Sequence, residues 1–313
     1  MKSTWFSKLR LKKIARALGI AAAIFFGTTI LWVIALKWIN PPTTFLQLTT
    51  SCPAGVRFHK EWVDAEHISN YMKLAVVSSE DNNFMKHGGI DWGAVEKAKK
   101  YNETEGKRKG KYRGASTITQ QTAKNVFLWP GQSKFSKWIR KAFEVYFTYL
   151  IEWIWGKDRI MEVYLNVIEM GPCKFGVGAA AKDYFGVSAS ALSREQAALI
   201  AACLPNPKKY SVAKPGAYMK KRQSQIARLM RLIGDDYFKR YGSEVAREER
   251  EARERDVEEE LKKLPDDEVP SIVDESSAAE QPKEEITPET IAPAVIDDAP
   301  ANDEVQSDTS SSN

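Results

Sequence analysis

Residues 69–91, SNYMKLAVVSSEDNNFMKHGGID, join an apolar helical segment to a polar turn with two adjacent carboxylates. Ser69 can cap a helix whose apolar side chains recur at helical intervals as far as Val77. Glu80 and Asp81 then fall at the C-terminal end of this helix, where the helix dipole disfavours negative charge. Because this arrangement is unfavourable for stability, it indicates a functional site.

Two interpretations of the turn stay open from the residue types alone. In the first, Asp81 caps the following turn and Glu80 is an ordinary solvated residue. In the second, Glu80 is a general base at an open cleft, and hydrogen bonds from Asp81 and His87 fix the loop.

Two further polar segments follow along the chain. Residues 114–125, GASTITQQTAKN, are rich in hydroxyl, amide and ammonium donors, and a helix beginning near Ser116 and Thr117 would add free N–H groups for an anion. The alternative is an ordinary capped polar helix. Arg140 and Glu144 have the i, i+4 spacing of a helical ion pair, which by itself contributes only about 0.2–0.5 kcal/mol.

The rest of the body is also predicted to be helical. Residues 140–166 have helical periodicity, which Gly156 and its two successors interrupt, and Ser193 with Gln196 forms a capping box. No strand pattern of comparable strength appears. Residues 97–113 contain eight bases and two acids and are interpreted as a mobile loop. The GxGxxA pattern at residues 176–181 favours close helix packing, because no strand precedes it.

The charge is divided unevenly along the 313 residues. Residues 264–313 contain fourteen acids and one base, a net charge of −13, so residues 1–263 carry +18 of the total +5. This tail has no aromatic residue, and we expect it to be disordered. The three cysteines, Cys52, Cys173 and Cys203, are too few and too scattered to predict a disulfide scaffold or a zinc site.

The N-terminal region predicts a membrane span. Residues 17–36 contain no charge and are long enough to cross a bilayer as a helix. A cleaved signal peptide is the alternative, but the apolar run is longer than the usual core of about 7–15 residues. Six bases precede the span, so the positive-inside rule predicts a cytoplasmic N-terminus and an external body.

The predicted organisation has six parts. They are a basic cytoplasmic segment (1–16), a transmembrane helix (17–37), a linker (38–57), a catalytic domain (58–245), a charged helix or linker (246–263) and the acidic tail (264–313).

Taken together, the motifs closely resemble those of the peptidoglycan glycosyltransferases of family 51. The matching patterns are EDxxFxxHxGxD from Glu80, GxSTxTQQ with KN from Gly114, RKxxE from Arg140, RIxExYLN from Arg159 and AAxxYFG from Ala180. The resemblance covers roughly residues 58–210 and implies a mainly α, lysozyme-like, two-lobed domain whose cleft lies against the membrane. With one span before the domain and no large second domain after it, the chain resembles the monofunctional form.

The resemblance also implies roles for individual residues. Glu80 would be the catalytic base and Glu144 the second catalytic carboxylate, near a pyrophosphate. The implied substrate-binding residues are Ser116, Thr117, Gln120, Gln121, Lys124, Asn125, Arg140 and Lys141, and the implied loop-fixing residues are Asp81, Phe84 and His87. No cofactor or metal is implied with certainty, although a divalent cation such as Mg²⁺ could accompany the pyrophosphate.

The implied reaction is growth of a glycan chain from lipid II, with inversion at the anomeric carbon and release of undecaprenyl pyrophosphate. Lipid II, the nascent strand, the membrane and other cell-wall synthesis proteins are the expected partners, and nucleic acid is not expected. The expected location is the bacterial inner membrane, with the catalytic domain on the periplasmic side. Two alternatives are a lysozyme-like lytic glycosidase and an inactive membrane-anchored scaffold.

Two local points stay open. Relatives carry an arginine four residues before Arg140, where this chain has Ser136, and either Lys134 or Lys137 could supply the missing charge. Residues 126–129, VFLW, either enter the outer face of the bilayer or pack in the core behind the site.

Overall fold

A computed structural model of the protein describes residues 2–110, 112–130 and 133–241. The predicted charged segment from residue 246 and the acidic tail lie outside these residues. The helices are α1 (Lys2–Trp38), α2 (Phe45–Thr49), α3 (Asn70–Glu80), α4 (Trp92–Tyr101), α5 (Lys107–Lys109), α6 (Ile118–Phe127), α7 (Lys134–Val167), α8 (Gly176–Phe185), α9 (Arg194–Cys203), α10 (Ala217–Ile233) and α11 (Tyr237–Tyr241). Short 3₁₀ turns η1 (Ala65–His67) and η3 (Ala189–Ala191) and the π-helical turn η2 (Asn102–Gly106) complete the helical set.

The predicted helix boundaries are confirmed at three places. Ser69 caps α3 by accepting a hydrogen bond from the Tyr71 N–H, and Ser193 forms the predicted capping box at α9. The long helix α7 changes direction at Gly156, whose φ of 75° lies in the left-handed region that favours glycine. The chain is therefore mainly α, as predicted.

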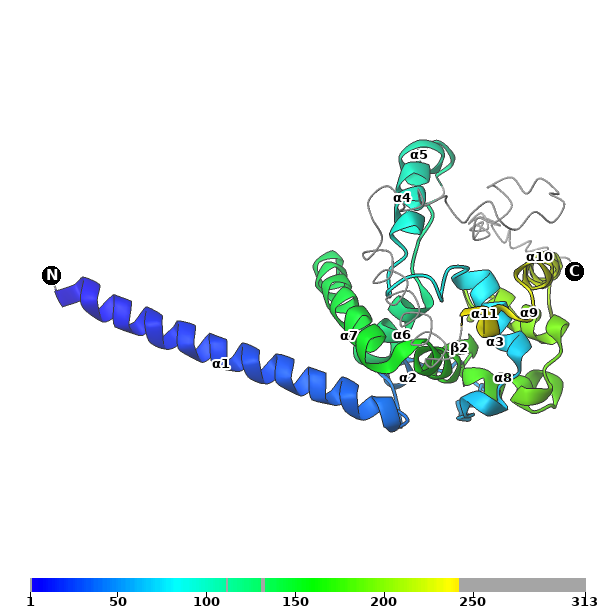
Figure 1. The fold of residues 1–313 in the computed structure, drawn as a ribbon, viewed down its shortest axis with the longest axis horizontal. Coiled ribbons are helices and arrows are strands. Elements are labelled where there is room, and N and C mark those ends of the chain that lie inside the picture. Colours follow the sequence, from blue (N-terminus) through cyan, green and yellow to red (C-terminus); the bar gives the residue numbers. More distant parts are fainter. Residues whose placement is uncertain (1, 111, 131–132, 242–313) are drawn as a thin grey trace, which may run out of the picture.

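The helices form two groups on either side of the Glu80 turn. In one group, α3 packs against both α9 and α10, and in the other, α6 packs along α7 (Figure 1). Met72, Ala75 and Val76 of α3 are fully buried. Because α3 ends at Glu80, this packing fixes the predicted base between the two groups.

A small sheet, which the sequence did not predict, packs against α8 and α9. Its strands are β1 (His59–Lys60), β2 (Glu169–Gly171) and β3 (Lys174–Phe175), in the order β1-β3-β2, with β1 parallel and β2 antiparallel to β3. Strand β3 ends directly before the GxGxxA pattern, where the sequence predicted no strand. Gly178 of α8 does pack closely, but against the non-helical segment before η1, where a Cβ would lie 2.7 Å from the Val63 side chain.

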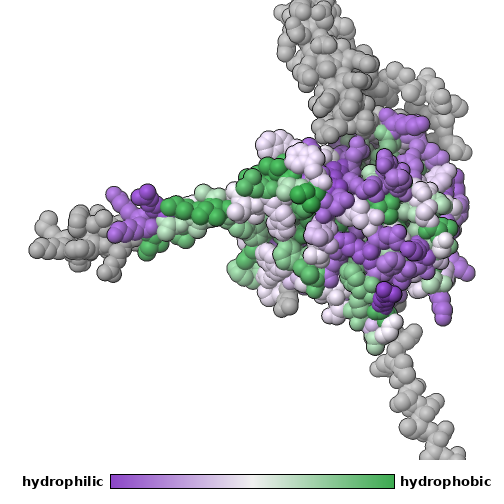
Figure 2. Space-filling view, turned by 90° about the horizontal axis from the view of Figure 1, so that it is seen from below, coloured by the Kyte–Doolittle hydropathy of each residue, from purple (hydrophilic) through white to green (hydrophobic). Residues whose placement is uncertain are grey.

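Helix α1 is joined to the body through α7. It contains an apolar span, Lys12–Trp38, that is long enough to cross a membrane. The Trp155 indole donates to the Val33 carbonyl at 2.8 Å, and the Arg159 guanidinium donates to the Leu36 carbonyl at 3.0 Å. In Figure 2 hydrophobic side chains cover the part of α1 next to the body and the adjoining side of the body, whereas hydrophilic side chains lie farther out along α1 and on the opposite part of the body.

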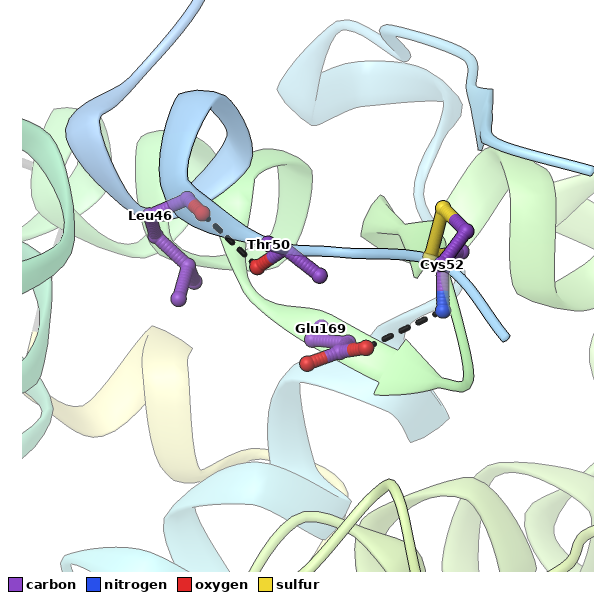
Figure 3. Close-up of a disulfide and its surroundings, with 5 residues drawn as sticks. Leu46, Thr50, Cys52 and Glu169 are labelled. Carbon is purple, nitrogen blue, oxygen red and sulfur yellow. Dashed lines mark hydrogen bonds between the residues drawn. A yellow bond between two sulfur atoms is a disulfide. The ribbon is translucent and has the colours of Figure 1, made fainter. Parts of the chain in front are cut away.

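One disulfide corrects the expectation drawn from the cysteine count. Cys52, in the segment after α1, bonds to Cys173 in the turn between β2 and β3, and Cys203 is free and buried. The Cys173 N–H donates to a Glu169 carboxylate oxygen at 3.0 Å, beside the bridge (Figure 3). Because the cysteines are 121 residues apart in sequence, only the fold shows that they are neighbours.

The basic segment at residues 97–113 is also different from its prediction. The sequence predicts a mobile loop, but α4, η2 and α5 extend over most of the segment. Asp91 begins this element by accepting a hydrogen bond from the Ala94 N–H at 2.8 Å. The high lysine content is compatible with helix, since lysine has a good helix propensity.

Candidate active site

Asp81 and His87 hold the turn after α3 through a network of hydrogen bonds. Asp81 accepts from His87 Nε2 at 3.0 Å and from the Ile118 N–H, at the start of α6, at 3.0 Å. The Gly89 N–H donates to His87 Nδ1 at 3.2 Å, so His87 carries its proton on Nε2. The network therefore ties the end of α3 to the beginning of α6.

Phe84 and Thr117 add to the same junction. Phe84 is fully buried, with the Lys157 ammonium 4.6 Å from its ring centre. The Thr117 hydroxyl donates to the Gly89 carbonyl at 2.6 Å. Thr117 and Gln120 also form the capping box of α6. Both side chains are buried in these local bonds, which gives them a structural role, and their contact with substrate stays a prediction.

Glu80 lies partly buried opposite α6. Gln121 Nε2 donates to Glu80 Oε2 at 2.9 Å, and the buried Tyr164 hydroxyl contacts Gln121 Oε1 at 3.5 Å. Burial raises the pKa of Glu80 above its ordinary value, although the Gln121 hydrogen bond and the positive charges of Arg222 and Lys124 act in the opposite direction. A carboxylate with a raised pKa is suited to proton transfer near neutral pH.

Lys124 follows Gln121 by one helical turn on α6. Burial lowers the pKa of its ammonium, while the negative charges of Glu144 and Glu80 raise it. Arg140 and Lys141 lower this pKa further. Lys124 is thus electrostatically coupled to both predicted carboxylates and to the two predicted cations of α7.

Glu144 is buried and forms its ion pair with Lys141, not with Arg140. The Lys141 ammonium lies 2.5 Å from Glu144 Oε1, and the described residues contain no ion pair between Arg140 and Glu144, the alternative that their i, i+4 spacing allowed. Both bases lie within one turn of Glu144, so spacing alone could not decide between them. Arg140 Nε is buried without a hydrogen-bond partner among the described residues.

The remaining predicted contact residues lie at the two ends of α6. Ser116 is exposed immediately before the helix, and Asn125 is partly exposed one residue after Lys124. Ser136 accepts a hydrogen bond from the Trp129 indole at 3.2 Å, so its side chain is engaged with a neighbouring aromatic residue. Lys137 is exposed, and the side chain of Lys134 is outside the described part of the chain.

Sequence reasoning missed Arg222, which lies on α10, far from the motifs in sequence. Only 3% of its surface is exposed, and its Nη2 donates to the Ser79 carbonyl at 3.3 Å. Its Nη1 has no hydrogen-bond partner among the described residues. The burial of this arginine beside the last turn of α3 indicates a functional role, but only the fold shows that it lies near Glu80.

The apolar segment after Asn125 belongs to the core. Val126, Phe127 and Leu128 are each less than 5% exposed, and the Phe127 ring stacks on Phe147 with centroids 4.5 Å apart. The membrane interpretation is wrong for these three residues, because their side chains are buried, and Phe127 also contacts Trp32 of α1. Only Trp129, at 39% exposure, stays at the surface.

The fold and this site define a helical glycosyltransferase with two carboxylates separated by basic side chains. A family model described as "Transglycosylase" matches residues 48–231. The chain belongs to this family and is a peptidoglycan glycosyltransferase.

Curated relatives support this assignment, and each carries the description "Biosynthetic peptidoglycan transglycosylase". A protein of Bacteroides thetaiotaomicron is 50% identical over 230 residues, which cover 72% of this chain and 90% of the relative. A Bdellovibrio bacteriovorus protein is 47% identical over 66% of this chain and 81% of the relative. A Pseudomonas aeruginosa protein is 43% identical over 69% of this chain and 92% of the relative.

Proposed function

We propose that the protein lengthens glycan strands from lipid II. The 4-hydroxyl of the GlcNAc unit of lipid II attacks the anomeric carbon of the growing strand. Undecaprenyl pyrophosphate leaves from the opposite face, so the α configuration inverts to β. The observation that carries this proposal is the placement of Glu80 against Gln121, with Lys124 one turn farther along α6.

Glu80 accepts the hydroxyl proton in this mechanism. Its raised pKa makes it a stronger base than an ordinary glutamate, and the Gln121 bond holds one carboxylate oxygen in a fixed position. Asp81 and His87 fix the backbone on which Glu80 lies. The catalytic carboxylate therefore needs little rearrangement before it can accept the proton.

The leaving diphosphate needs positive charge more than it needs a strong acid. Lys124, Arg140 and Lys141 supply this charge, and Glu144 orients Lys141 through their ion pair. Ser116 and Asn125 are accessible to the sugar or phosphate oxygens.

A divalent cation would have to share the diphosphate with these bases. The described residues hold no group of three or more histidine, cysteine or carboxylate side chains suited to a metal. An Mg²⁺ ion would therefore take most of its ligands from the diphosphate and water, as Mg²⁺ commonly does in phosphate sites.

The proposed location is the bacterial inner membrane, with the body on the periplasmic side. The six bases before the apolar span support a cytoplasmic N-terminus. The Cys52–Cys173 disulfide supports the external placement independently, because disulfides persist in oxidising compartments.

The test is incubation of the full chain in detergent with labelled lipid II, followed by separation of the products by length. We expect long strands from the parent and none from Glu80→Gln. The matched control is Glu66→Gln, because Glu66 is an exposed glutamate on η1. Release of short fragments from preformed glycan would instead indicate a lytic glycosidase. Lipid II binding without turnover by the parent would indicate a scaffold.

A further inference from the structure

The element formed by residues 92–113, here named the basic arm, has a defined shape. It contains eight basic and three acidic residues. The Asn102 side chain bonds to both the N–H and the carbonyl of Arg113, at 2.7 and 2.9 Å. The Arg113 guanidinium lies 3.6 Å from the centre of the Tyr101 ring. These contacts close the arm into a hairpin.

The described lysines of the basic arm and Arg108 are exposed. No residue of α4 is buried, and the helices of the arm contact mainly each other. Lys100, Arg108 and Lys109 pair with glutamates of the arm. Lys97, Lys99 and Lys107 are exposed and take no part in these pairs, so their charges are available to a partner.

The position of the arm relative to α1 indicates which partner it meets. In Figure 1 α1 slopes from the left to the lower centre, and α4 and α5 project upward, crosswise to α1, above the end of α1 that joins the body. A membrane crossed by α1 would therefore have its outer surface alongside the arm. Trp92 and Tyr112 are 64% and 65% exposed, and such rings favour the membrane interface.

We propose that the basic arm binds the headgroups of anionic phospholipids. A negative lipid surface attracts basic segments, and the attraction fades within about one Debye length, roughly 8–10 Å. The attraction of each lysine near such a surface corresponds to about a fivefold change in binding. This contact would hold the body close to the bilayer without using any catalytic residue, so the proposal does not depend on the proposed reaction.

The experiment places an environment-sensitive dye on the arm of the full chain in lipid nanodiscs. Thr104→Cys gives an exposed attachment site, since the native cysteines are disulfide-bonded or buried. Nanodiscs of phosphatidylcholine are compared with nanodiscs rich in phosphatidylglycerol, without substrate. We expect the dye to report a less polar environment in the anionic nanodiscs, and high salt to reverse the change.

Charge variants test whether the lysines of the arm are responsible. The arm variant replaces Lys97, Lys99 and Lys107 with glutamine and should lose most of the lipid-dependent signal. The control variant replaces the exposed Lys208, Lys214 and Lys220 with glutamine and removes the same charge from another surface. It should keep the signal. Circular dichroism of both variants should match the parent.

Three results would overturn the proposal. Equal signals in the two kinds of nanodisc would show that the arm does not sense lipid charge. An equal loss in the arm and control variants would show a general charge effect. A salt-sensitive signal of the same size in detergent without lipid would indicate that the acidic tail of the chain, not the membrane, occupies the arm.

Discussion

Replacing Gln121 with methionine tests how the structure sets the proton affinity of Glu80. The change keeps a side chain of similar length but removes the donor that lies 2.9 Å from Glu80 Oε2. A hydrogen bond to a charged group is worth about 1.5–3 kcal/mol, and about 1.4 kcal/mol corresponds to one pKa unit. Because Glu80 is only partly buried, water recovers part of this energy, and we expect its pKa to increase by about one unit.

The direction of the effect follows from the role of Glu80 as a base. A base works only when ionised, so activity falls as the pH decreases through its pKa. Gln121→Met should move the acid limb of the kcat/KM profile upward by about one pH unit and leave the high-pH plateau nearly unchanged. The assay is polymerisation of labelled lipid II over a pH series.

Gln223→Met is the matched control, because Gln223 donates to the Glu195 carbonyl on a different part of the body. Its acid limb should coincide with that of the parent. If Gln121→Met lowers the plateau and leaves the acid limb in place, then Gln121 acts on the substrate and not on Glu80. A shift of the limb to lower pH would contradict the sign of the reasoning.

Three other predictions concern stability and the membrane. Glu80→Gln should remove polymerisation and raise the melting temperature at pH 7, because the raised pKa of Glu80 in the folded state means that its ionisation destabilises the fold. The gain in melting temperature should vanish below about pH 4, where the carboxyl group is protonated in both states, and a lower melting temperature at pH 7 would contradict the reasoning. Replacing Cys52 and Cys173 with serine should lower the free energy of unfolding by about 2–5 kcal/mol, and the parent protein in reductant should melt like the variant. A variant whose melting curve matches that of the oxidised parent would show that the disulfide does not stabilise the fold. Trp138→Ser with Trp153→Ser should preserve the melting temperature, because these side chains are 71% and 84% exposed, but should reduce activity on membrane-embedded substrate more than on a soluble analogue. A large loss of stability, with the ratio of the two activities the same as in the parent, would exclude membrane contact.

Local signals predicted much of the fold. The hydroxyl of Ser69 and the capping boxes at Thr117 and Ser193 mark helix starts because their hydrogen bonds join residues two or three positions apart. Gly156 marks the change of direction in α7, since its backbone conformation is strained for other residues. These features need no knowledge of distant neighbours.

Features that depend on distant neighbours could not be predicted. The partner of Cys52 lies 121 residues away, and Arg222 reaches the Ser79 carbonyl from a helix 143 residues farther along the chain. The aromatic ring of Phe127 is typical of residues that contact a membrane, but Phe147 and Trp32 of α1 cover it. The choice of Lys141 as the partner of Glu144 depends on side-chain direction, which the spacing of residues does not determine.

The hydrogen bonds from Trp155 and Arg159 to carbonyl oxygens of α1 determine which features of the anchor could be exchanged. Both donors recognise the backbone of α1, so its side chains at Val33 and Leu36 can change while the bonds persist. The Thr29 hydroxyl, in contrast, contacts the Tyr146 hydroxyl at 3.0 Å and needs a matching residue. A span taken from another protein would present the same backbone carbonyls but would lose the contact with Tyr146 unless it carried a hydroxyl at the position of Thr29. An exchanged anchor should therefore dock on α7 through its backbone and lose only this side-chain contact.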